Sequence, residues 1–247
     1  MKTILQKCTN SDFEYLSEVL DSYVSFTNDE KRKLLLEMRT TQDKKELIDL
    51  IDKQIRYYGS SDIMYLLRSI FSDDGGVPAE EIILDVADKL KVKIKVGSSV
   101  EKSLETLAKS VVEKELLSKT PEELYEYFKK IGVGDTDNKA IIEFMKKNGT
   151  VAILPILTEI LGSKITFSIL QSILISIISS MIGREAAKKI VQELLKRNPW
   201  LQTLGPVMWV ISGTWLAFDL QGPAFRKTVP ICLYLGIVSL RDGEENE

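Results

Sequence analysis

Residues 165–183, ITFSILQSILISIISSMIG, decide the fold. As an α-helix, these nineteen uncharged residues extend about 28 Å, close to the roughly 30 Å hydrocarbon thickness of a bilayer. Ser168, Ser172, Ser176 and Ser180 recur at every fourth position of the run. Small residues at that spacing let another helix approach closely, in lipid or in water. The stretch therefore predicts a helix with a tightly packed helical partner, whichever solvent surrounds it.

A second uncharged run occupies residues 198–218, NPWLQTLGPVMWVISGTWLAF. Its three tryptophans, Trp200, Trp209 and Trp215, are scattered through the run, whereas an aromatic belt would place them at its ends. A third run, Thr228 to Leu240, has thirteen residues and is too short to span a bilayer comfortably.

A basic segment, residues 184–197, joins the first two runs. It holds two acidic and five basic residues, the latter being Arg184, Lys188, Lys189, Lys196 and Arg197. If residues 165–183 spanned a membrane from a cytoplasmic N-terminal part, this segment would lie outside, against the positive-inside tendency. A simple two-span anchor is thus disfavoured.

Three interpretations of these apolar runs remain open. In the first, they form the interior of a soluble bundle, shielded by amphipathic neighbours. In the second, they form a hairpin that stays shielded until it meets a bilayer, where the basic segment lies on anionic headgroups. In the third, they are constitutively integral. The basic residues and the three tryptophans are the expected contacts with a membrane or a partner.

The charge distribution changes near residue 150. Residues 1–150 hold 24 Lys+Arg and 28 Asp+Glu, whereas the remaining 97 residues hold 9 and 8. We therefore expect a charged soluble helical region over 1–150, an apolar helical hairpin region over 151–241 and an acidic tail over 242–247.

Apolar residues in the first region recur at helical spacing, so we predict an all-α, multi-helix bundle. Ser11 with Glu14, and Thr120 with Glu123, have the spacing of capping boxes, and Pro78 suits a helix start. Residues 91–96 alternate Lys with Val and Ile, so a short strand could form there. The expected helices are 11–24, 28–39, 42–57, 60–71, 78–94, 99–118, 121–131 and 138–147.

The composition excludes much of enzyme chemistry. The chain has no histidine, so imidazole-based nucleophile activation and histidine-ligated metals are absent. Cys8 and Cys232 are far apart in sequence and form no CxxC pair, so we expect buried thiols, no metal and no cofactor. The net charge of -3 gives no sign of nucleic-acid binding. No signal-peptide pattern opens the chain, so we expect a cytoplasmic protein, peripheral to or inserted in the inner membrane under the membrane interpretations.

The C-terminal motif begins after the second run. Asp219 and Arg226 flank a turn at Gly222 and Pro223, close enough to pair across it, and the element closes at Pro230. A local clamp is one interpretation of this pair, and binding of a lipid headgroup or another anion is the other.

Two sequence blocks resemble a known family. GPVMWVISGTWLAFDLQGPAFRKTVPICLYLGIVSLR (residues 205–241) resembles the C-terminal signature of the YaaW-like family of uncharacterised bacterial proteins, and residues 55–94 resemble its middle region. Residues 73–78, DDGGVP, depart from the usual pattern as an insertion. The resemblance implies a ubiquinol-cytochrome c chaperone-like middle region and an assembly role near a membrane, and it implies no catalytic residue.

Our leading prediction is a non-enzymatic helical protein that associates with a membrane lipid or a membrane-protein client through residues 151–241. The alternative is a soluble protein-interaction or chaperone-like module whose apolar helices are buried internally.

Overall fold

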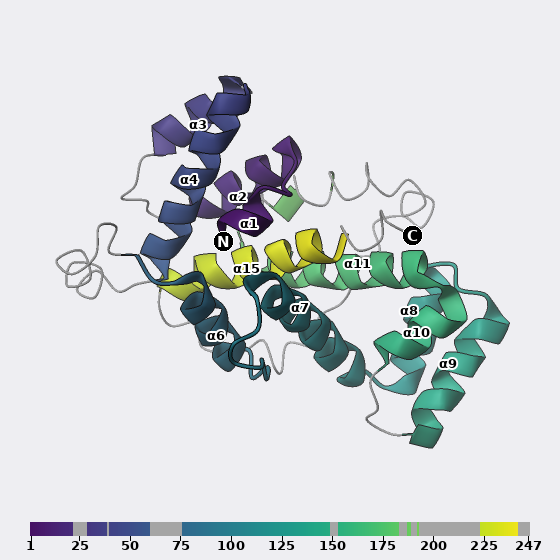
Figure 1. Cartoon of the computed structure of the whole chain (residues 1–247). Coiled ribbons are helices and arrows are strands. Elements are labelled where there is room, and N and C mark those ends of the chain that lie inside the picture. The colour runs from purple at the N-terminus through teal and green to yellow at the C-terminus, as the bar shows by residue number, and fades with distance from the viewer. Residues whose placement is uncertain are drawn as a thin grey trace.

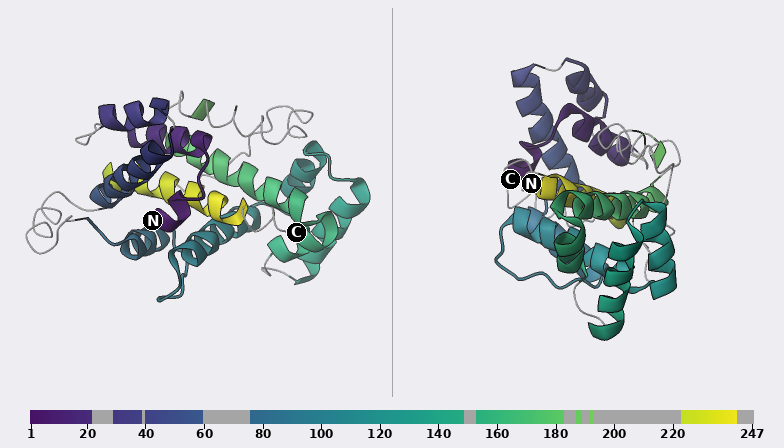
Figure 2. Two further views of the ribbon diagram at one scale, coloured as in Figure 1. Left: turned by 45° about the horizontal axis from the view of Figure 1, so that its top comes forward. Right: turned by 90° about the vertical axis from the view of Figure 1, so that its right-hand side faces the viewer.

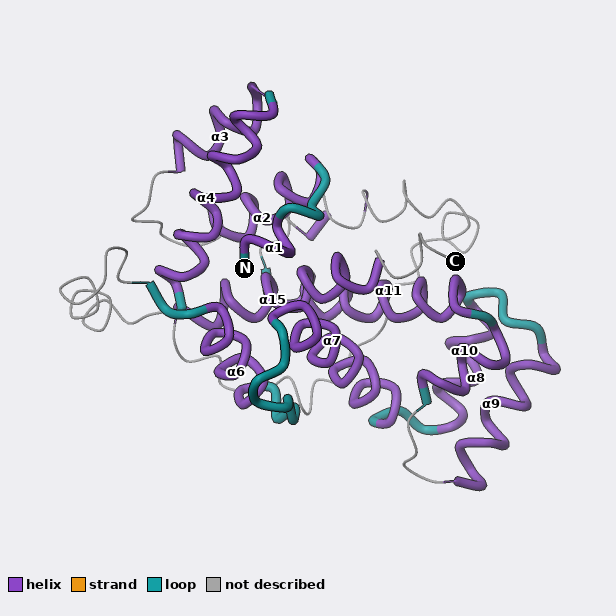
Figure 3. Tube along the Cα trace, viewed as in Figure 1, coloured by secondary structure: helices purple, strands orange, loops and turns teal. Residues whose placement is uncertain are grey.

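The computed structural model is all-helical. It describes residues 1–21, 29–38, 40–59, 76–148, 153–182, 187–188, 192 and 223–241. These residues contain eleven helices and no strand (Figure 3), which confirms the predicted all-α, multi-helix bundle.

The helices agree with the predicted ranges to within a few residues at most boundaries, and the predicted helix over 60–71 lies outside the described residues. In chain order they are α1 (Lys2–Leu5), α2 (Asn10–Asp21), α3 (Asp29–Met38), α4 (Thr41–Tyr58), α6 (Ala79–Lys89), α7 (Val100–Leu117), α8 (Pro121–Lys130), α9 (Asp135–Asn148), α10 (Leu154–Leu161), α11 (Ser163–Met181) and α15 (Pro223–Arg241).

The helices form layers around a central antiparallel pair, α11 and α15 (Figure 1). Helices α1 to α4 lie on one side of this pair, and α6 and α7 lie on the other (Figure 2). Helices α8, α9 and α10 gather near the start of α11. The C-terminal helix α15 contacts α1, α2, α4, α6, α7 and α11, so it lies at the centre of the bundle.

Local sequence signals explain several helix starts. The predicted capping box at the start of α8 is confirmed, because the Thr120 N–H donates to Glu123 Oε2 at 2.7 Å and the Glu123 N–H donates to Thr120 Oγ1 at 3.2 Å. The box predicted from Ser11 and Glu14 is wrong. Helix α2 begins at Asn10, and the capping contact lies two residues earlier than predicted, where the Thr9 N–H donates to Asp12 Oδ2 at 2.7 Å.

The short strand considered for residues 91–96 does not form. Helix α6 ends at Lys89, and Lys91 adopts the left-handed conformation with φ 54°. The Val92 N–H then donates to the Ala87 carbonyl at 2.8 Å, which closes the helix end as a Schellman motif does. Val92 is buried, so its apolar side chain packs on the helical core and pairs with no second strand.

Helix α15 is buried along most of its length. From Lys227 to Ser239 every residue is buried, as a helix that is apolar all round requires. At Gly236 the helix crosses α7 closely enough that an added Cβ would lie 2.7 Å from Ala108 Cβ and 2.8 Å from the Leu104 carbonyl oxygen. Only glycine fits this crossing without a shift of the backbone.

The composition boundary near residue 150 separates charged from apolar sequence, yet helices from both sides of it pack together. Helix α15 belongs to the apolar region and packs mainly on α7, which belongs to the charged region. The division into domains at 150 stays a prediction, and the tail 242–247 lies outside the described residues.

Candidate functional site

The predicted C-terminal motif falls at the start of the central helix. Pro223 is the first residue of α15, Arg226 is exposed, and Pro230 lies buried inside the helix. Asp219 and Gly222 lie outside the described residues, so the clamp between Asp219 and Arg226 stays a prediction.

The neighbouring Lys227 is buried, with 2% of its surface exposed. Its Nζ donates a hydrogen bond to the Leu20 carbonyl near the end of α2 and lies 3.9 Å from the centroid of the Tyr58 ring. A cation at a helix C-terminus and over an aromatic face is stabilised by both. Lys227 therefore joins α15 to α2 and α4. The sequence did not single out Lys227, because apart from its place in the C-terminal motif it looks like any exposed lysine.

The far end of α15 is held by a buried carboxylate. Asp12 is fully buried and accepts hydrogen bonds from the Tyr234 hydroxyl at 2.8 Å and from Arg241 Nη2 at 2.9 Å. Burial would lower the pKa of Arg241, but the hydrogen bonds and charge of Asp12 more than reverse this and raise it. The Tyr234 ring also packs on Tyr15, with ring centroids 3.7 Å apart. The contacts of Asp12 join α2 to α15 across more than 220 positions, which local patterns cannot reveal.

A second buried polar cluster joins α2, α3 and α4. Arg32 is fully buried and donates to the Ser17 hydroxyl at 2.8 Å, to Gln54 Oε1 at 2.6 Å and to Asp29 Oδ1 at 2.7 Å. It also pairs with Asp21. The partners of Arg32 come from α2, α3 and α4, so its guanidinium joins these three helices.

The four serines at every fourth position of α11 lie in different environments. Ser168 and Ser176 are buried, Ser172 is partly buried and Ser180 is exposed. Ser168 and Ser180 donate to carbonyls of their own helix, at 3.0 and 2.6 Å. Ser172 faces Tyr127 of α8, where burial raises the pKa of the phenol to about 12 and the Ser172 hydroxyl lowers it by less. The helix packs against α7, α10 and α15, so α11 has helical partners inside the protein.

Of the predicted contacts with a membrane or a partner, only Lys188 lies among the described residues, and it is exposed. The other positions lie outside them: Arg184, Lys189, Lys196, Arg197, Trp200, Trp209 and Trp215. Among the described residues, α11 alone is long and apolar enough to cross a membrane, and 67% of its most apolar window is buried inside the protein. Such burial is also what the core helix of a soluble protein shows.

A half-open cavity of about 300 Å³ lies where α7, α10, α11 and α15 meet. Its volume is at the lower end of the roughly 300–1,000 Å³ of small-molecule sites. The residues around it are Glu105, Lys109, Leu154, Thr158, Ser163, Thr166, Phe167, Leu170, Ser239 and Leu240. A second cavity, between α2, α3 and α4, measures about 160 Å³ and is too small for that class of ligand.

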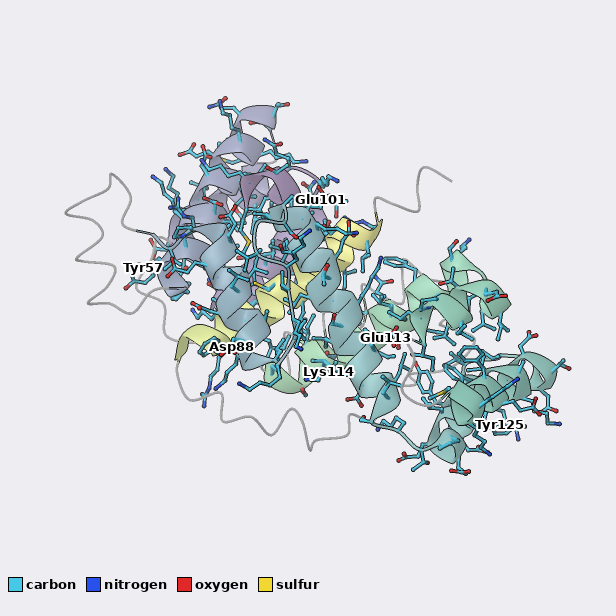
Figure 4. The ribbon with its side chains drawn as sticks, turned by 60° about the horizontal axis from the view of Figure 1, so that its bottom comes forward. Tyr57, Asp88, Glu101, Glu113, Lys114 and Tyr125 are labelled. Carbon is cyan, nitrogen blue, oxygen red and sulfur yellow. The ribbon has the colours of Figure 1, made fainter. Side chains whose placement is uncertain are left out.

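Glu113 and Lys114, which are neighbours on α7, contact the start of α10 and the end of α6 (Figure 4). The Glu113 carboxylate accepts the backbone N–H groups of Ile153 and Leu154, both at 2.8 Å, and so caps the start of α10. Lys114 Nζ donates to the Leu90 carbonyl at 2.9 Å beyond the end of α6. Burial lowers the pKa of Lys114, as does the nearby charge of Lys91. Helix α7 thereby positions α10, which forms one wall of the larger cavity.

Metal and thiol chemistry find little support in the part of the chain that the structure describes. Those residues contain no group of three or more His, Cys, Asp or Glu side chains that could hold a metal ion. Cys8 and Cys232 are both free and buried, as expected, and burial raises the pKa of the Cys232 thiol to about 12. A thiol in that environment stays protonated and is a poor nucleophile.

The chain is similar to UPF0174 proteins of Helicobacter pylori. One from strain J99 is 27% identical over 209 residues, which cover 85% of this chain and 77% of the relative. One from strain 26695 is 24% identical over 192 residues, which cover 77% of this chain and 87% of the relative. A further J99 protein is 24% identical over 185 residues, covering 74% and 83%.

No family profile matches the chain, and no solved structure matches it significantly. The relatives support kinship with an uncharacterised bacterial family, and their names state no activity, ligand or partner. The resemblance to the YaaW-like family and the chaperone-like middle region stay predictions.

Proposed function

We propose that this protein is a non-enzymatic helical binding module that keeps its apolar helices α11 and α15 inside its own fold and acts through contacts with a partner. The observation that supports this most strongly is the burial of α15 on all sides, with polar anchors at both ends. Lys227 binds the Leu20 carbonyl at one end, and Arg241 pairs with Asp12 at the other. Moving α15 into lipid would break both anchors and leave Asp12 without its cation, which is costly for a buried charge.

The absence of enzyme activity remains part of the proposal. The polar side chains that line the larger cavity are hydroxyl groups, one carboxylate and one amine. The carboxylate, Glu105, is already paired with Lys102 at 3.1 Å. The chain has no histidine that could activate one of the hydroxyls. Such a lining suits binding better than bond-breaking chemistry.

The test is the behaviour of the full chain in water. We expect it to purify without detergent as a single species in size-exclusion chromatography with light scattering, and to unfold cooperatively in urea. Recovery only in a membrane fraction that resists both high salt and alkaline carbonate would contradict the proposal.

A second candidate function is association with an anionic membrane surface. Two observations favour it: the spanning length of α11, and Ile165 at its start, which is 42% exposed. Deleting residues 151–241 would be a poor test because it removes α15 from the core. A sharper test compares Lys188→Glu with Lys146→Glu, since both lysines are exposed and only the first belongs to the basic segment.

Binding to phosphatidylglycerol vesicles should weaken in Lys188→Glu and stay unchanged in Lys146→Glu. A full chain that does not sediment with these vesicles at low salt, where surface attraction is strongest, would exclude this second function.

A further inference from the structure

The larger cavity has a polar mouth and an apolar wall. Lys109 of α7, Thr158 of α10 and Ser163 of α11 are exposed and form its mouth. Phe167 and Leu240 are partly buried and belong to its apolar wall. Ligand sites usually combine such a surface with a few polar groups that orient the ligand.

Lys109 is the exposed charged side chain of the cavity lining. Glu105, the carboxylate of the lining, is neutralised by Lys102 at 3.1 Å. Lys109 is exposed, and no hydrogen bond or ion pair joins it to another described residue. Helix α11 also starts here, and its N-cap residue Gly162 offers no side chain to the first N–H groups. The cavity therefore favours an anionic group beside Lys109.

The volume limits the size of the occupant. A water-sized group takes about 30 Å³ of a liquid, so a cavity of 300 Å³ holds about ten of them. That volume suits one unbranched chain of medium length and is too small to enclose a whole phospholipid with two acyl chains.

We propose that this cavity binds a medium-chain carboxylate. The aliphatic tail lies against Phe167, Leu170 and Leu240, and the carboxylate pairs with Lys109 at the mouth. The inference rests on the proposed function in one respect, because the cavity exists only while α11 and α15 pack inside the folded chain.

Calorimetric titration of the full chain tests this with three probes, with decanoate kept below its micelle concentration and decanol below its solubility limit. Decanoate has both parts of the expected ligand, decanol has the tail with a neutral head, and acetate has the head alone. We expect saturable binding of decanoate, weaker binding of decanol and no detectable binding of acetate.

Variants then locate the site. Lys109→Gln should weaken decanoate binding about threefold, since an exposed ion pair is worth little, and should leave decanol binding unchanged. Thr158→Trp should abolish binding of both because the larger ring closes the mouth from α10. Ser163→Trp closes the same mouth from α11 and serves if the first variant is misfolded. Lys146→Gln is the matched control, since it removes an equal charge from an exposed residue that does not line the cavity.

Circular dichroism and size-exclusion chromatography of the same samples distinguish failure of the proposed function from failure of the ligand site. A chain that is not folded and soluble without detergent refutes the proposed function. A folded chain that does not bind decanoate refutes the ligand site, as does binding that Thr158→Trp and Ser163→Trp leave intact. Sedimentation with phosphatidylglycerol vesicles combined with no binding of free decanoate would assign the anion preference to a membrane surface and overturn this inference.

Discussion

The contact between α15 and α7 at Gly236 gives the sharpest test of the central helix. An alanine Cβ there would lie 2.8 Å from the Leu104 carbonyl oxygen and 2.7 Å from Ala108 Cβ. Such overpacking costs about 1–3 kcal/mol, and the upper part of that range, about 2–3 kcal/mol, applies here because the backbone oxygen cannot turn away as a flexible side chain could. Alanine in a helix interior recovers about 1 kcal/mol relative to glycine. Gly236→Ala should therefore lower the free energy of unfolding by about 1–2 kcal/mol.

Urea denaturation followed by circular dichroism measures this change. With an m-value of about 3 kcal/mol/M, the midpoint should fall by about 0.5 M. The matched variant is Ala108→Gly, which removes one of the two close contacts and leaves the Leu104 carbonyl in place. In the double variant the effect of Gly236→Ala should shrink by about 1 kcal/mol. An unchanged or raised midpoint in Gly236→Ala would refute the close crossing of the two helices.

Three further predictions concern residues that support the bundle. Lys91→Gly should raise the free energy of unfolding by about 0.5–1 kcal/mol, because glycine adopts φ 54° without strain. Urea titrations measure this change, and a loss of stability would count against the left-handed conformation at the end of α6. Asp12→Ala should lower the thermal midpoint and reduce the free energy of unfolding by about 3 kcal/mol, because Arg241 and Tyr234 lose their buried acceptor. A reduction below about 1 kcal/mol would refute the role of Asp12 as an anchor of α15. Burial raises the pKa of Tyr127 to about 12, whereas an unfolded tyrosine titrates near 10.0, so between these pH values the unfolded chain loses a proton that the folded chain keeps and stability falls as pH rises. Urea titrations at pH 9 and pH 12 should therefore show a drop that is smaller by about 2–3 kcal/mol in Tyr127→Phe, and equal drops would contradict the buried phenol.

The helices were predictable because their signals are local. Thr120 and Glu123 are three residues apart, and proline follows the first of them, so the start of α8 could be predicted without tertiary information. The start of α2 shows the limit of such patterns. Thr9 with Asp12, and Ser11 with Glu14, have the same spacing, and the pattern does not rank them. The first pair forms, and its aspartate is the one that also binds Arg241.

The cavity was not predictable for a related reason. Its residues come from four helices that lie between positions 105 and 240 of the chain. Lys109 looks like any other lysine on an amphipathic helix, and Thr158 like any solvated threonine. Only the packing of α10 and α11 against α7 and α15 brings them together, and sequence spacing carries no information about that packing.

The uncharged run in α15 is too short to span a bilayer, and that short length explains its place in the fold. Thirteen uncharged residues, Thr228 to Leu240, make a helix of about 20 Å, too short for a bilayer. That length suits the centre of a small bundle, where α15 contacts six helices that lie between residues 2 and 181. The longer uncharged run in α11 is long and apolar enough to cross a membrane, yet α11 packs on α15. Because α15 is anchored by Lys227 and Arg241 at its two ends, any exit of α11 into lipid would have to leave α15 behind with one face uncovered. The burial of α15 is therefore the stronger constraint on where α11 can go.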